Sequence, residues 1–93
     1  MKITARNLVA HELIGLEVCV EKCSDPTWVG RSGTIVDETR NMLKIYVDGV
    51  VKAVAKATAT FRIRLPDGST CTIDGAKLVG RPEDRIRRLR WRG

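Results

Sequence analysis

The sequence from residue 42 to residue 51 reads Met42-Leu43-Lys44-Ile45-Tyr46-Val47-Asp48-Gly49-Val50-Val51. Apolar side chains recur at every second position from Leu43 to Val47, which is the period of a strand with one buried face. Asp48-Gly49 is a strong signal for a two-residue hairpin turn, and more valines follow it. This stretch therefore predicts two antiparallel strands joined by a tight turn.

Short segments of the same kind lie on both sides of this hairpin. Further strands are predicted over residues 16–21, 34–36, 60–65 and 71–73, with turns at Ser24-Asp25-Pro26, Pro66-Asp67-Gly68 and Asp74-Gly75. The alanine-rich stretch from residue 52 to residue 59 fits a short helix and an irregular strand equally well. Five or six short strands in so short a chain predict a mainly β fold, a small closed or nearly closed barrel.

Both ends of the chain have helical patterns. Leu8, Glu12 and Leu13 lie at helical spacing and predict a helix at about 4–13. Pro82, with acidic residues directly after it, suits the first turn of another helix, so a basic helix or tail is expected at about 81–93. The 93 residues are enough for one domain, residues 1–93, with the barrel at about 14–80.

Positive charge is concentrated at the C-terminal end. The net charge is +6, and residues 77–93 hold seven basic and two acidic residues against ten and nine in the rest of the chain. A nearly neutral body with an arginine-rich end predicts a polyanionic partner, because arginine forms bidentate contacts with phosphate. No apolar run approaches the roughly 20 residues of a membrane span, so we expect a cytoplasmic protein without membrane contact.

Residues for catalysis or metal binding are few. The segment His11-Glu12-Leu13-Ile14-Gly15 lacks the second histidine of a zinc-protease motif, and it contains the only histidine of the chain. Cys19, Cys23 and Cys71 lack zinc-site spacing and are expected to be reduced thiols. Turn chemistry accounts for Asp67 and Asp74. We therefore expect no catalytic residue, no metal site and no cofactor bound by this chain.

Several segments, in their order and spacing, resemble protein component 1 of archaeal ribonuclease P, the counterpart of the eukaryotic subunit shared by ribonucleases P and MRP. The glycine pattern of residues 29–36 is also similar to that of SH3-like barrels in translation proteins. The segments that carry the family resemblance are Asn7-Leu8, His11-Glu12-Leu13-Ile14-Gly15-Leu16, Val29-Gly30-x-x-Gly33, Val36-Asp37-Glu38-Thr39, Leu65-Pro66-Asp67-Gly68, Ile73-Asp74-Gly75 and Arg81-Pro82-Glu83-Asp84-Arg85.

The resemblance implies a six-stranded antiparallel Sm-like/SH3-like barrel with short terminal helices. It implies a non-catalytic, RNA-binding subunit of the ribonucleoprotein that removes the 5′ leader from precursor tRNA. The implied partners are ribonuclease P RNA and the zinc-ribbon protein subunit, with precursor tRNA as the substrate and magnesium at the RNA of the holoenzyme. The chain alone is then expected to be inactive. The family often has Pro-Lys where this chain reads Val51-Lys52-Ala53, which leaves the RNA role of that loop open.

Site residues are predicted from charge and position. Side chains expected to contact RNA are Lys22, Arg31, Arg40, Lys52, Lys56, Arg85, Arg87, Arg88, Arg90, Trp91 and Arg92. Trp91 fits stacking on a base or docking on a protein equally well. Leu8, His11, Leu13 and Ile14 either cap the barrel or form the interface with the protein partner. Two other functions fit a basic barrel: a ribosome-associated protein, or an adaptor that binds an acidic protein.

Overall fold

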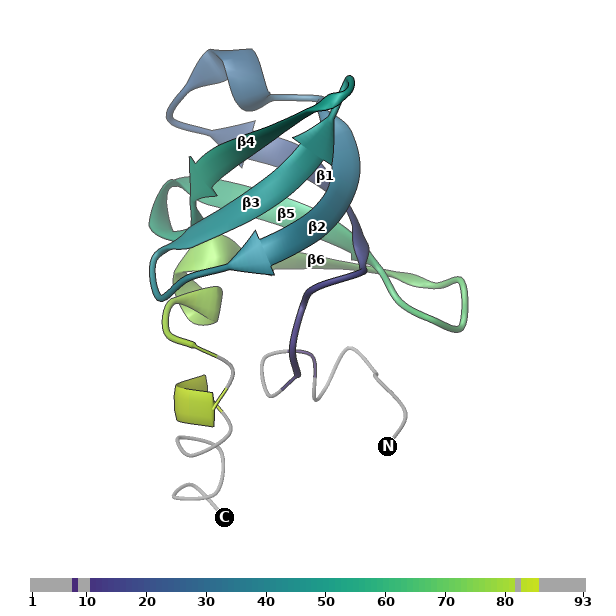
Figure 1. The fold of residues 1–93 in the computed structure, drawn as a ribbon, viewed down its shortest axis with the longest axis vertical. Helices are drawn as coiled ribbons and strands as arrows, with labels where there is room; N and C mark the ends of the chain where they lie inside the picture. The colour runs from purple at the N-terminus through teal and green to yellow at the C-terminus, as the bar shows by residue number, and fades with distance from the viewer. Residues whose placement is uncertain (1–7, 9–10, 82, 86–93) are drawn as a thin grey trace.

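Six strands form one strongly bent antiparallel sheet in the computed structural model, which describes residues 8, 11–81 and 83–85 (Figure 1). Their spatial order is β4-β3-β2-β1-β5-β6. The strands are β1 (Glu17–Cys23), β2 (Ser32–Glu38), β3 (Met42–Val47), β4 (Val50–Ala55), β5 (Ala59–Arg64) and β6 (Thr70–Asp74). Short 3-10 helices connect them: η2 (Pro26–Trp28), η3 (Lys56–Thr58) and η4 (Gly75–Leu78).

The predicted hairpin forms with β3 covering the predicted residues. Val47 pairs with Val50, so Asp48 and Gly49 are the two turn residues. Both have positive φ angles, 51° and 82°, as the turns that match the twist of a hairpin require. The local turn chemistry therefore sets the register of β3 against β4.

Apolar residues at alternate positions of the strands build the core. Leu43 and Ile45 of β3 belong to the same core cluster as Phe61 and Ile63 of β5, and all four are fully or almost fully buried. Trp28 of η2 covers one part of this cluster. Since the opposite side chains of the same strands point outward, polar residues such as Lys44, Arg62 and Arg64 lie on the outer surface of the sheet.

The two ends of the sheet are bridged by helical turns. Within the described part of the chain, β4 pairs only with β3 and β6 only with β5, while η3 and η4 contact each other beside them. Gly75 lets η4 approach closely: a Cβ atom there would collide with the carbonyl oxygens of Lys56 and Ala59 and with the ring of Phe61. The barrel is completed by this packing.

Three segments refine the sequence predictions. Both interpretations of residues 52–59 hold in part, because β4 continues to Ala55 and η3 follows it. The predicted helix at 4–13 lies mostly outside the described residues, and residues 11–13 are irregular, whereas residues 83–85 are helical.

We expect Gly75→Ala to destabilise the fold by about 3 kcal/mol, the upper range for overpacking, because backbone atoms on two sides leave no room for a methyl group. Gly68→Ala is the control. Nothing lies within 4 Å of the corresponding Cβ position, and only its φ of +89° opposes the change, at about 1 kcal/mol. Urea unfolding of both variants measures the difference; equal losses would contradict the packing argument.

Candidate nucleic-acid interface

Four of the predicted RNA contacts lie at the surface. Lys22, Arg40 and Lys52 are exposed, on β1, on the turn between β2 and β3, and on β4. Arg31 is half-buried, donates to the carbonyl oxygen of Thr27 and forms an ion pair with Asp48 at 3.2 Å. All four side chains can be reached from solvent, and their contact with phosphate stays a prediction.

Lys56 and Arg85 are not surface residues, and their assignment as phosphate contacts is wrong for this structure. The exposed fractions of Lys56 and Arg85 are 0% and 1%. Both were assigned from charge alone, in segments with the composition of a loop and of a basic tail. Both side chains form ion pairs inside the protein.

Glu38, the last residue of β2, is the partner that both buried cations share. Lys56 Nζ lies 2.7 Å from Glu38 Oε2, and Arg85 Nη1 lies 2.8 Å from the same oxygen. Arg85 Nη2 donates to Oε1 at 3.2 Å, so Arg85 binds the carboxylate in a bidentate manner. The Glu38 side chain is only 1% exposed. We call Glu38, Lys56 and Arg85 the buried ion cluster.

Backbone carbonyl groups accept the remaining donors of the cluster. Lys56 donates to the carbonyl oxygens of Thr39 and Gly80, at 2.7 and 3.1 Å. Arg85 donates to those of Gly80 and Leu78, and to His11 at 2.9 Å. The cluster holds two positive charges and one negative charge, and these carbonyl dipoles help to offset the excess, as buried charges require.

The buried ion cluster joins segments that are distant in the sequence. Glu38 Oε1 also accepts a hydrogen bond from the Leu13 amide at 3.3 Å, while Arg85 reaches the carbonyl of His11. The N-terminal approach to β1 and the helical turn at residues 83–85 therefore lie at one end of the barrel (Figure 1). Glu38 and Arg85, which belong to two of the segments that carry the family resemblance, meet here.

The two cations determine the protonation of Glu38. Burial alone would raise the pKa of this carboxyl group, but hydrogen bonds from Arg85 and Lys56 and the charges of both residues outweigh it. Together they hold the pKa of Glu38 below its ordinary value. Glu38 is consequently ionised at neutral pH, and the cluster is intact there.

The residues predicted to meet a protein partner divide into two groups. Leu8 and Leu13 are fully buried in the core, so they cap the barrel, and their assignment to the interface is wrong for this structure. Ile14 is 44% exposed, and His11 is partly buried. Only these two remain candidates for contact with a partner.

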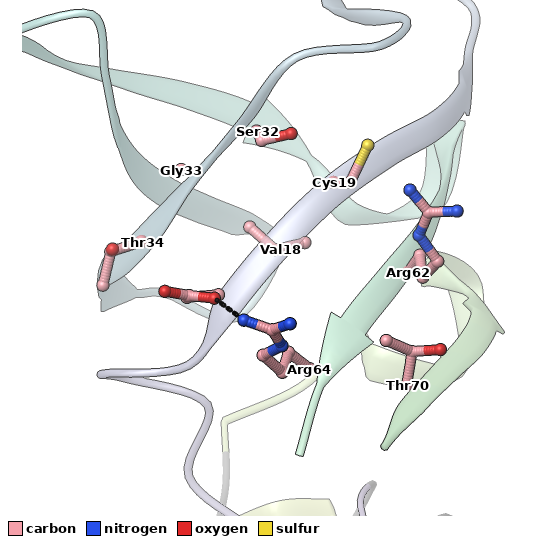
Figure 2. A pocket seen from close by; sticks show the side chains of 9 residues that line it. Val18, Cys19, Ser32, Gly33, Thr34, Arg62, Arg64 and Thr70 are labelled. Atoms are coloured by element: carbon pink, nitrogen blue, oxygen red, sulfur yellow. Dashed lines mark hydrogen bonds and ion pairs between the residues drawn. The ribbon is translucent and has the colours of Figure 1, made fainter. Parts of the chain in front are cut away.

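A polar groove of about 550 Å³ crosses the outer face of β2, β1, β5 and β6 (Figure 2). β1 forms its floor at Cys19, with Ser32 and Thr34 on one side and Arg62 and Arg64 on the other. No sequence prediction assigned a function to these arginines. The alternation of residues 60–65 placed them outward, but the neighbouring strands come from distant segments.

Other predictions have mixed outcomes. Asp67 and Asp74 are turn residues as predicted, since their carboxylates accept from the amides of Ser69 and Ala76. Cys19, Cys23 and Cys71 are free thiols. Among the described residues, no group of three His, Cys, Asp or Glu side chains could hold a metal ion, and no helix is long and apolar enough to span a membrane. Arg87, Arg88, Arg90, Trp91 and Arg92 lie outside the described residues.

Comparison with known proteins identifies the family of this chain. Residues 6–88 match the family model for ribonuclease P/MRP, subunit p29. The chain belongs to this family. Similar relatives are the ribonuclease P protein component 1 of Thermofilum pendens, 52% identical with 95% of each chain covered, and that of Methanothermobacter thermautotrophicus, 47% identical with 92% of this chain and 94% of the relative covered.

A solved structure of the p29 family also matches. It is described as a homologue of the human ribonuclease P protein Rpp29, is 48% identical and superposes with a TM-score of 0.60 over 82% of this chain and 99% of that chain. The predicted fold, a mainly β Sm-like/SH3-like barrel of six antiparallel strands, is confirmed.

We expect Glu38→Gln to lower the free energy of unfolding by about 3–5 kcal/mol, because it leaves Lys56 and Arg85 buried without a counter-charge. Glu17→Gln, which breaks the exposed pair with Arg64, is the matched control and should cost at most about 1 kcal/mol. Urea unfolding at pH 7 measures both. Similar small losses of unfolding free energy in the two variants would show that the buried ion cluster does not stabilise the fold.

The same cluster predicts a pH dependence. The pKa of Glu38 is lower in the folded chain than its ordinary value of 4.5, so its stabilising effect is complete above that value. The effect is lost as the pH falls through the folded-state pKa. The stability difference between the wild type and Glu38→Gln should therefore shrink below about pH 4.5. A difference that stays constant from pH 7 to pH 3 would contradict this assignment.

Proposed function

We propose that this chain is a non-catalytic, RNA-binding protein subunit of ribonuclease P, the ribonucleoprotein that removes the 5′ leader from precursor tRNA. Membership of the p29 family over residues 6–88 carries the proposal. The chain would assemble in the cytoplasm with ribonuclease P RNA and with the zinc-ribbon protein subunit. Catalysis belongs to the RNA and its magnesium ions.

The charge distribution supports RNA as the main partner. The net charge is +6, and Lys22, Arg40 and Lys52 are exposed on different elements of the barrel. The arginines after residue 85 add four more positive charges in the sequence. Phosphate contacts from such side chains fix the position of a protein on RNA without reading its bases.

The site chemistry supports a subunit without catalytic residues. Several carboxylates on the described surface engage neighbouring cations or turn amides, as Asp48 does with Arg31 and Asp74 with the Ala76 amide. The most strongly buried carboxylate, Glu38, is held by two cations and cannot act as a base toward a bound substrate. The described residues therefore support binding and assembly.

Ile14 is the best-placed residue for the zinc-ribbon partner. It is a large exposed apolar side chain directly after the segment that the buried ion cluster fixes. An apolar contact at a preformed position loses little entropy on binding. Family membership favours this assembly over the ribosome-associated barrel and over the adaptor for an acidic protein.

The proposal is tested by reconstitution with ribonuclease P RNA, the zinc-ribbon subunit and the other protein subunits. With magnesium, the complete mixture should cleave precursor tRNA at the 5′ leader, the chain alone should not, and omission of the chain should lower the rate at limiting magnesium. Cleavage by the purified chain would contradict the non-catalytic role. Full activity without it, together with no binding to ribonuclease P RNA, would overturn the proposed function.

The arginines of the C-terminal end give a sharper prediction. Arg87, Arg88, Arg90 and Arg92 are replaced together by glutamine, while Arg85 is kept because it is buried. Affinity for ribonuclease P RNA should fall, and the slope of log K against log salt should flatten by about 0.7–0.9 for each phosphate that is no longer neutralised. Binding to the zinc-ribbon subunit should persist. An unchanged salt slope would exclude these arginines as phosphate-binding residues.

A further inference from the structure

The groove in Figure 2 brings together side chains from four strands. Cys19 pairs with Ser32 of β2 and with Arg62 of β5, and Arg64 pairs with Thr70 of β6. Their neighbours along the strands, such as Val18 and Ile63, point into the core. The alternation of the strands therefore turns hydroxyl and guanidinium groups outward, together with the Cys19 thiol and the Glu17 carboxylate.

The two arginines are spaced as a nucleic acid backbone requires. Arg62 and Arg64 are two residues apart on the same face of β5, which corresponds to about 6.6–6.8 Å along an extended strand. This distance is close to the separation of successive phosphates along a polynucleotide strand. Ser32, Thr34 and Thr70 add hydroxyl groups, and arginine, serine and threonine are residue types that contact sugar and phosphate.

The lining is unlike the centre of a protein–protein interface. Such centres are rich in aromatic residues and poor in charged ones. Among the described residues, no aromatic side chain lines the groove, and the one large aliphatic side chain there, Val18, is only 3% exposed. The groove offers hydrogen-bond donors from arginine and hydroxyl side chains and no large exposed apolar side chain among its lining residues, which favours an RNA strand over a protein segment.

Each arginine is held by a carboxylate in the absence of a ligand. Arg64 Nη1 lies 3.2 Å from Glu17 Oε2, and Arg62 Nη1 lies 3.0 Å from Glu21 Oε1. These pairs are solvent-exposed and therefore weak, and each occupies one of the five N–H donors of a guanidinium group. The remaining donors can bind phosphate, whereas the two carboxylates oppose it.

We propose that this groove binds the sugar-phosphate backbone of a single strand of ribonuclease P RNA, with Arg62 and Arg64 on successive phosphates. The inference rests on the proposed function and deepens it, because it adds a sheet-face RNA site to the contacts expected at the turns and the C-terminal end. Glu17 and Glu21 hold the arginines in place and set an upper limit on the affinity of the site.

The proposed site predicts that substitutions of neighbouring residues change the affinity for RNA in opposite directions. Arg62→Gln with Arg64→Gln should weaken binding of ribonuclease P RNA and flatten the slope of log K against log salt by about 1.4–1.8, the value for two phosphates that are no longer neutralised. Glu17→Gln should tighten binding. Lys44→Gln with Lys77→Gln is the matched control, because it removes the same net charge from exposed positions outside the groove. It should leave the slope nearly unchanged.

Cys19 allows the site to be located directly. Cys23 and Cys71 are replaced by alanine, an iron chelate is attached to Cys19, and hydroxyl radicals are generated in the reconstituted complex with ribonuclease P RNA. Cuts should fall in one short RNA segment and should disappear when Arg62 and Arg64 are replaced by glutamine. A chelate on Val51→Cys, in a variant whose own three cysteines are alanine, is the control; Val51 is 55% exposed on β4, outside the groove, and should give different cuts.

The outcomes separate this inference from the proposed function. An assembled, active complex without Cys19-directed cuts, with an unchanged salt slope for the arginine pair, would overturn the groove as an RNA site and leave the proposed function intact. Loss of binding to the zinc-ribbon subunit in the arginine variant, with RNA binding unchanged, would assign the groove to a protein and overturn the inference. Failure of the wild-type chain to bind ribonuclease P RNA would overturn both.

Discussion

One carboxylate, that of Glu38, holds the terminal segments of this protein to its barrel. It lies at the end of β2 and receives Lys56 from η3, Arg85 from the C-terminal turn and the amide of Leu13. Local hydrogen bonding fixes the strands, but no strand includes residues 11–16 or 79–85. A buried negative charge between two buried positive charges anchors them, in addition to the backbone hydrogen bonds of Gly15 and Leu16 with Ile35 and the burial of Leu13.

The basic residues of this family member therefore serve two purposes. Lys56 and Arg85 are withdrawn from solvent and satisfied by a carboxylate and by backbone carbonyl groups. Lys22, Arg40, Lys52 and the arginines of β5 are exposed and remain available to a polyanion. The net charge of +6 thus overstates the charge that the chain offers to RNA, since the buried ion cluster carries one unit of it.

The sequence predicts the strands well and the buried ion cluster poorly, for a physical reason. The alternation in residues 42–47 and 60–65 and the Asp48-Gly49 turn are local signals, and each forms as predicted. Burial of Lys56 and Arg85 is set by partners 18 and 47 residues away in the sequence. A single charged residue gives the same local pattern whether it faces water or a buried carboxylate. The groove could not be predicted from the sequence for a similar reason, because the four strands that form it are not consecutive in the sequence.

The central claim is that the Glu38 carboxylate fixes both terminal segments to the barrel. Native-state hydrogen exchange, followed by NMR for single amides in the wild type and in Glu38→Gln, tests this most directly. The amides of Leu13, Gly80 and Arg85 bond to Glu38 Oε1 and to the carbonyls of Arg40 and Arg81. In Glu38→Gln these three amides should lose protection from exchange together. The core amides of β1, β2 and β5 should remain more strongly protected than these three. Unchanged protection of these three amides would contradict the account.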